Sequence, residues 1–107
     1  MKLKLPDIHN INNRIICSQC NTMDNFALHE IDLLKGDMVY FFTDGYADQF
    51  GGPLRKKLQY KNFKKLLLVH CRLSMTEQQY NLDKALKDWK GSSDQIDDIL
   101  VIGVKII

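Results

Sequence analysis

Two short acidic sequences in this chain could support metal-dependent chemistry. Asp44-Gly45 ends the apolar run Met38–Thr43, and Asp97-Asp98 comes directly before the apolar run Ile99–Ile107. Both runs are typical of buried strands, because apolar residues fall on both of their faces. If the two strands pair antiparallel, the end of the first lies beside the start of the second. We therefore expect Asp44 and Asp97 at the same edge of a sheet.

Two converging carboxylates would favour a hard divalent cation between them. They repel each other unless a positive charge intervenes, and their oxygen ligands suit Mg²⁺ or Mn²⁺ better than zinc. A pair of such ions can generate hydroxide and hold a phosphoryl group for in-line displacement. Gly45 would leave room for a phosphate, since it has no side chain. The spacing alone also fits a simpler interpretation, in which Asp44-Gly45 is a turn and Asp97-Asp98 a polar strand entry.

The composition is that of a single globular domain. The chain has 107 residues, 45% of them hydrophobic and 26% charged, which is enough apolar material for one core. Its net charge of +2 gives no strong electrostatic reason to expect nucleic acid or an anionic membrane as a partner. The apolar runs fall short of the roughly 20 residues that a membrane span needs, and residues 1–10 lack the apolar centre of a signal peptide. We expect a cytoplasmic protein.

The three cysteines fit reduced thiols better than a disulfide framework, because their number is odd and no export signal precedes them. Cys17 and Cys20 form a C-x-x-C pair. A zinc site would need Cys71 and one of the three histidines (His9, His29 or His70) to complete it. A redox role would place the pair at the start of a helix, whereas its surroundings predict a strand and a turn. We interpret the pair as reduced thiols.

The sequence before Asp44 predicts a hairpin. A strand at Phe26–Leu33 and the strand at Met38–Thr43 are separated by a predicted turn at Lys35-Gly36-Asp37. Residues 1–13 are polar and show no clear period, so we expect a loosely structured entry segment there.

Two helices are predicted between the acidic sequences. The first has Phe63, Leu66, Leu67 and His70 on one side, and its lysines on the other side indicate a solvated face rather than a nucleic-acid patch. The second begins at a capping box, Ser74–Glu77, and ends at Gly91. Its stripe of apolar residues is predicted to lie in the core: Leu82, Ala85, Leu86 and Trp89.

The two acidic sequences in context, KGDMVYFFTDGYADQFGG and WKGSSDQIDDILVIGVKI, closely resemble the bacterial PPM-type (protein phosphatase 2C-like) serine/threonine phosphatases, in the stage II sporulation protein E subfamily. Residues 1–22 are a poorly matched entry segment, and residues 23–107 resemble the C-terminal portion of the phosphatase domain. The resemblance implies an α+β fold: the C-terminal part of an α-β-β-α sandwich, with antiparallel strands and a pair of helices packed on one face.

The resemblance also implies a binuclear Mg²⁺ or Mn²⁺ site whose hydroxide attacks a phosphoserine or phosphothreonine. Asp44 matches a metal-ligating acid of the family's threonine-aspartate-glycine motif, and Asp97 matches the first acid of its late aspartate pair. No catalytic residue is expected beyond these metal ligands. Four residues of the two motifs are expected to have supporting roles: Thr43, Gly45, Asp48 and Asp98.

The family context suggests bacterial signalling, with a phosphoprotein substrate such as an anti-sigma factor antagonist. The chain departs from the family in one respect. In the family, an aspartate-x-threonine-glycine-histidine-glycine segment helps to hold the metals, and no such segment occurs before Phe26 in this chain.

Three hypotheses follow. In the first, the chain is an incomplete phosphatase domain that is inactive alone and works with a missing N-terminal part. In the second, it is an inactive remnant that serves as a binding or dimerisation module, for instance as a homodimer. In the third, it is a small autonomous enzyme. We favour the first.

Overall fold

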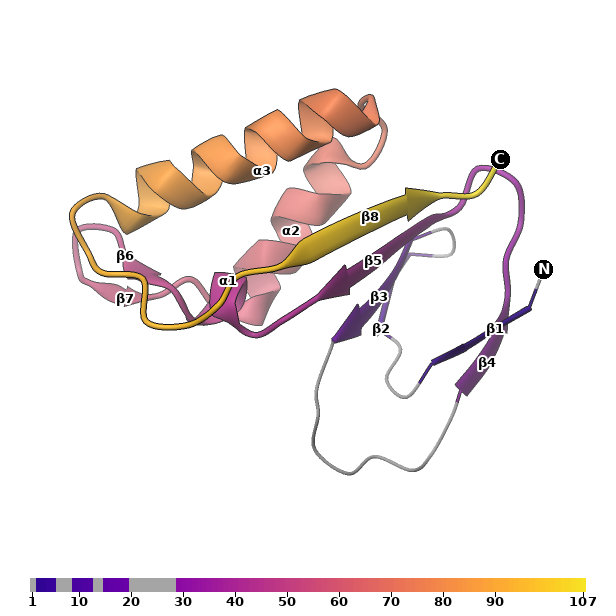
Figure 1. Ribbon diagram of the computed structural model, residues 1–107, viewed down its shortest axis with the longest axis horizontal. Coiled ribbons are helices and arrows are strands. Elements are labelled where there is room, and N and C mark those ends of the chain that lie inside the picture. Colours follow the sequence, from indigo (N-terminus) through magenta and orange to yellow (C-terminus); the bar gives the residue numbers. More distant parts are fainter. Residues whose placement is uncertain (1, 6–8, 13–14, 20–28) are drawn as a thin grey trace. The chain divides into compact units, whose positions relative to one another are not determined.

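The structure is a computed structural model, and it describes residues 2–5, 9–12, 15–19 and 29–107 (Figure 1). The chain forms two compact units. The first comprises Met1–Thr43 and Leu100–Ile107, and the second comprises Asp44–Ile99.

The described residues of the first unit form two β-sheets. One has four strands in the order β2-β3-β5-β8, and the other pairs β1 with β4. Strands β3 and β5 run parallel, whereas the other pairs in these sheets are antiparallel. The strands span the following residues: β1 Lys2–Leu5, β2 His9–Asn12, β3 Ile15–Gln19, β4 His29–Asp32, β5 Met38–Phe42 and β8 Val101–Lys105.

Strand β5 lies between β3 and β8 (Figure 1). An apolar strand that is buried on both faces is typical of a sheet whose two faces are both covered. Val39 and Phe42 are almost completely buried, and Val39 packs with Ile16 of β3 and with Leu33. The antiparallel pairing of β5 with β8 is confirmed, with Phe42 opposite Val101.

Two expectations from the sequence are wrong. The predicted hairpin does not form, because β5 uses both of its edges for β3 and β8, and β4 pairs with β1 instead. The entry segment is not loosely structured throughout, since its residues 2–5 and 9–12 form β1 and β2. The turn at Lys35-Gly36-Asp37 is present: Gly36 has a φ of 92°, and the Asp37 N–H donates to the Leu34 carbonyl at 3.0 Å.

The second unit contains three helices and a two-stranded hairpin. The elements are α1 Gly45–Asp48, β6 Phe50–Gly51, β7 Lys56–Lys57, α2 Tyr60–His70 and α3 Met75–Lys90. Tyr46 of α1 joins the helices, because its ring centroid lies 4.6 Å from that of Phe63 and its hydroxyl donates to the Leu82 carbonyl at 2.6 Å. Burial raises the pKa of the Tyr46 phenol, and the negative charge of Asp83 raises this pKa further.

The caps of α3 agree with the sequence in most respects. The Glu77 N–H donates to the Ser74 hydroxyl oxygen at 3.2 Å, and Gly91 ends the helix with a φ of 53°. The Glu77 carboxylate accepts from the Ser74 hydroxyl at 3.0 Å rather than from the serine N–H expected of a capping box. No helix in the described part of the chain has both the length and the apolar composition needed to cross a membrane.

Candidate metal centre

Asp44 lies between strand β5 and helix α1, at the N-cap position of the helix. Its carbonyl accepts the first helical hydrogen bond, from the Asp48 N–H at 2.9 Å. Its side chain makes no capping hydrogen bond, although aspartate at this position often does. The half-buried Asp44 carboxylate is therefore directed to other contacts.

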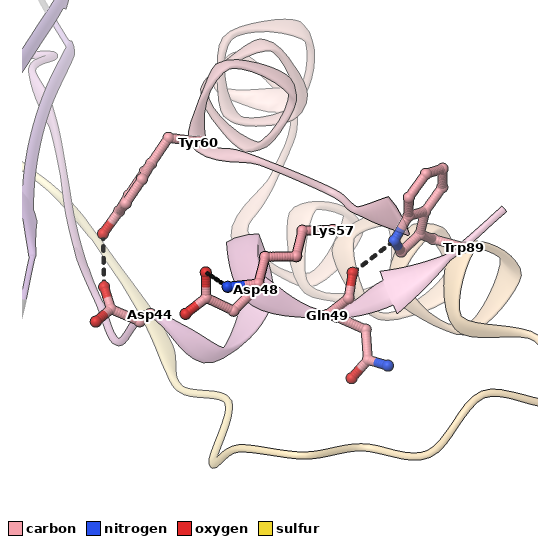
Figure 2. A network of polar contacts seen from close by, with 6 residues as sticks. All are labelled: Asp44, Asp48, Gln49, Lys57, Tyr60 and Trp89. Atoms are coloured by element: carbon pink, nitrogen blue, oxygen red, sulfur yellow. Dashed lines mark hydrogen bonds and ion pairs between the residues drawn. The ribbon is translucent and has the colours of Figure 1, made fainter. Parts of the chain in front are cut away.

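One of these contacts comes from Tyr60, the first residue of α2. Its hydroxyl donates to Asp44 Oδ1 at 2.9 Å (Figure 2). Tyr60 was not among the residues predicted from the sequence. It lies between Gln59 and Lys61 in a basic stretch, and neither its type nor its spacing from Asp44 indicates that the two side chains meet.

Gly45 brings the two acidic sequences into contact. A Cβ atom on Gly45 would overlap the Asp98 carbonyl oxygen and would lie 2.8 Å from the Asp98 carbonyl carbon. Only a residue without a side chain permits this approach of one backbone to the other. In this unit, therefore, the segment that starts with Asp44 lies directly against the segment that contains Asp97 and Asp98.

Thr43 joins the ends of the two strands in the first unit. Its N–H donates to the Leu100 carbonyl at 3.0 Å, and its hydroxyl oxygen accepts from the Leu100 N–H at 3.0 Å. The side chain thus extends the β5–β8 pairing by one residue beyond Phe42 and Val101. This is the structural role of the motif's threonine.

Asp97 and Asp98 are exposed. The Asp97 carboxylate accepts from the N–H of its neighbour Asp98 at 2.8 Å, and the Asp97 carbonyl accepts from the Gln95 side-chain amide at 3.0 Å. Asp48 differs, because it forms an ion pair of 3.7 Å with Lys57 of β7 (Figure 2). The structure therefore gives Asp48 a partner on the hairpin.

Gln49 is a second residue that sequence reasoning missed. It is 1% exposed, and its side-chain amide donates to the carbonyl of Asp94 at 2.9 Å. Its carbonyl accepts from the Trp89 indole N–H at 2.8 Å (Figure 2). Gln49 thereby holds the loop that leads to Asp97 against the end of α1. A buried side-chain amide requires such partners, but the sequence does not identify them.

The glycines after Gln49 make room for Trp89. A Cβ on Gly51 would overlap the Trp89 carbonyl, and a Cβ on Gly52 would lie 2.7 Å from the indole ring. Gly52 also has a φ of 71°, which favours glycine, and its N–H donates to the Trp89 carbonyl at 2.9 Å. These contacts attach the hairpin to the end of α3.

The acidic residues fit a divalent cation in part. Mg²⁺ usually takes one or two protein carboxylates and keeps several waters, and Asp44 and Asp97 are of this kind. Among residues 2–5, 9–12, 15–19 and 29–107, no group of three or more histidine, cysteine, aspartate or glutamate side chains could hold a metal ion. The described residues therefore do not make up a complete binuclear site. For the alternative zinc site, Cys17 is buried in β3 and Cys20 lies outside the described residues.

A separate groove of about 620 Å³ lies in the second unit, among Gly52-Pro53, α2 and α3. Leu66, Val69 and Trp89 give it an apolar lining, with Lys65 and Asp88 as its charged residues. Neither Asp44 nor Asp97 lines it. The groove is therefore distinct from the surroundings of Asp44 and Asp97.

No protein-family model matches the chain, and no curated protein matches it. Among solved structures, the chain is similar to the SiaA-PP2C domain of Pseudomonas aeruginosa, with a TM-score of 0.74 and 28% sequence identity over 79% of this chain. The match spans 35% of the length of that chain. The architecture is α+β and matches part of a PP2C-like fold, as the sequence predicts. The likeness supports the PPM type that the two acidic motifs indicate.

Proposed function

We propose that this chain supplies one part of the active site of a Mg²⁺- or Mn²⁺-dependent protein serine/threonine phosphatase, of the stage II sporulation protein E subfamily of PPM enzymes. The observation that carries the proposal is the contact of Gly45 with Asp98, which joins the two acidic motifs. The likeness to the SiaA-PP2C domain supports the phosphatase class. PP2C-like folds are generally metal-dependent, which agrees with the oxygen ligands offered here.

Each motif residue has a role in this proposal. Asp44 and Asp97 would hold the cation, and a bound Mg²⁺ or Mn²⁺ would supply activated water for attack on the phosphorus of phosphoserine or phosphothreonine. Thr43 fixes the strand ends through its two hydrogen bonds to Leu100. Gly45 keeps the turn free of a side chain beside Asp98. Asp98 provides the backbone against which Gly45 packs.

We further propose that the chain requires an additional N-terminal part to be active. It spans 35% of the length of the SiaA-PP2C chain, and the described residues contain no group of three or more acidic, histidine or cysteine side chains that could hold a metal ion. A cation held by two carboxylates alone would bind weakly. The substrate would be a phosphoprotein in bacterial signalling, such as an anti-sigma factor antagonist, in the cytoplasm.

We expect this chain alone to hydrolyse a phosphoserine peptide or an aryl phosphate at a negligible rate in Mn²⁺, because the site is incomplete. A phosphate-release assay with and without Mn²⁺ measures this. The Asp44→Ala variant is the control for a contaminating phosphatase, since a contaminant would remain active. Mn²⁺-dependent turnover that Asp44→Ala abolishes would contradict the incomplete-site hypothesis and would favour a small autonomous enzyme.

A second candidate function is that of a dimerisation module. One face of the C-terminal strand segment carries three apolar residues that are 40–48% exposed: Leu100, Ile102 and Val104. Apolar strips of this kind often mark contacts between proteins. We expect the chain to self-associate through this face, and Ile102→Lys to restore the monomer in light scattering. A wild-type chain that stays monomeric at high concentration would contradict this function.

A further inference from the structure

We propose that Tyr60 is a positioning residue for the metal centre, where its hydroxyl orients the Asp44 carboxylate. The inference rests on the proposed function and goes beyond it, because Tyr60 belongs to neither acidic motif. The contact that carries it is the hydrogen bond of 2.9 Å from the Tyr60 hydroxyl to Asp44 Oδ1 (Figure 2).

The backbone before Tyr60 is fixed against helix α1. Gln59 has a φ of 77°, and its N–H donates to the Ala47 carbonyl at 2.8 Å. The Leu58 N–H donates to the Gln49 carbonyl at 3.0 Å. Helix α1 begins directly after Asp44, so these bonds determine where the start of α2 lies relative to the carboxylate.

The first turn of α2 is also held by packing. Phe63 is fully buried and its ring lies 4.6 Å from that of Tyr46 of α1. The Lys64 ammonium lies 5.8 Å from the centroid of the Tyr60 ring, within the range of a cation–π contact. Tyr60 is thus attached to a rigid element, and its hydroxyl reaches Asp44 without reordering the chain.

A metal-ligating carboxylate must present a particular oxygen in a particular direction. Hydrogen bonds from neighbouring groups fix this orientation, and their removal commonly weakens metal binding by about 10- to 100-fold. The Asp44 side chain does not cap α1, so the helix start does not fix its orientation. The Tyr60 hydroxyl supplies one such constraint.

The test is Tyr60→Phe, which removes the hydroxyl and keeps the ring beside Lys64. We expect Mn²⁺ to bind about tenfold more weakly, as measured from the electron paramagnetic resonance signal of free Mn²⁺. The matched control is Tyr80→Phe, which removes the same group from a tyrosine of α3 that is 67% exposed, and it should bind Mn²⁺ as the wild type does. The midpoint of thermal unfolding in EDTA reports any loss of stability separately from metal binding.

A second measurement needs no variant of Tyr60. The tyrosines of the wild-type protein are labelled with ¹³C at the ring carbon that bears the hydroxyl. Mg²⁺ should change the ¹³C chemical shift of Tyr60 and leave that of Tyr80 unchanged. Two results would contradict the role of Tyr60 and leave the proposed function standing. They are an unchanged Tyr60 signal at saturating Mg²⁺, and equal Mn²⁺ affinity in Tyr60→Phe and the wild type. Absence of saturable metal binding by the wild type would overturn the proposed function together with this inference.

Discussion

Gly45→Ala is expected to lower the free energy of unfolding by about 1–2 kcal/mol. The new Cβ would overlap the Asp98 carbonyl oxygen and would lie 2.9 Å from Ile99 Cγ1, and overpacking of this kind costs about 1–3 kcal/mol. Alanine is favoured over glycine in a helix by about 1 kcal/mol, so the steric cost outweighs the gain. Denaturant unfolding followed by circular dichroism measures the difference. Because Asp98 must move, Mn²⁺ should also bind more weakly.

Gly91→Ala is the matched control for this substitution. A Cβ on Gly91 would meet no atom within 4 Å, and the backbone at this residue (φ 53°, ψ −124°) makes alanine unfavourable by about 1–3 kcal/mol. The substitution should therefore destabilise the protein without changing Mn²⁺ affinity. A Gly45→Ala variant as stable as the wild type would show that the two acidic segments do not lie as close as the structure places them.

Asp44→Asn is expected to weaken Mn²⁺ binding by about 100-fold or more, which exceeds the effect of losing a supporting hydrogen bond. Asparagine keeps the shape of the side chain and an oxygen that can accept from Tyr60, so the metal-free protein should remain folded. Calorimetric titration with Mn²⁺ measures the affinity, and circular dichroism in EDTA checks the fold.

Asp83→Asn is the matched control for Asp44→Asn. Asp83 lies on α3 in an exposed ion pair of 2.8 Å with Lys87, and such pairs contribute little to stability. Its replacement should leave Mn²⁺ affinity unchanged. Equal affinity in the wild type and Asp44→Asn would mean that any bound Mn²⁺ lies elsewhere on the chain.

The sequence predicted the parts of the fold that follow from local pattern. Strand β5 is apolar on both faces. Its antiparallel pairing with β8 was predicted because an acid follows the first apolar run and two acids precede the second. The helices α2 and α3 follow from helical spacing and from the Ser74 cap. Strand pairing over long distances was not predicted. Nothing local indicates that β4 pairs with β1 or that β3 runs parallel to β5.

The candidate site was also predicted only in part. Asp44, Gly45 and the late acidic pair are recognisable because their types and order are distinctive. Tyr60 and Gln49 are not, since their roles depend on where α2 and the loop after α3 lie in space. A tyrosine hydroxyl reaches a carboxylate 16 positions away only after the helices have packed. Such contacts come from tertiary structure rather than from sequence spacing.

The proposed function requires a divalent cation to bind where the two acidic motifs meet. The most direct measurement is paramagnetic broadening of backbone amide signals by substoichiometric Mn²⁺. The proposal predicts that signals of Asp44, Gly45, Asp97 and Asp98 broaden first, while those at the start of α3 stay sharp. Uniform broadening, or selective broadening around Asp83 and Asp88 instead, would contradict it.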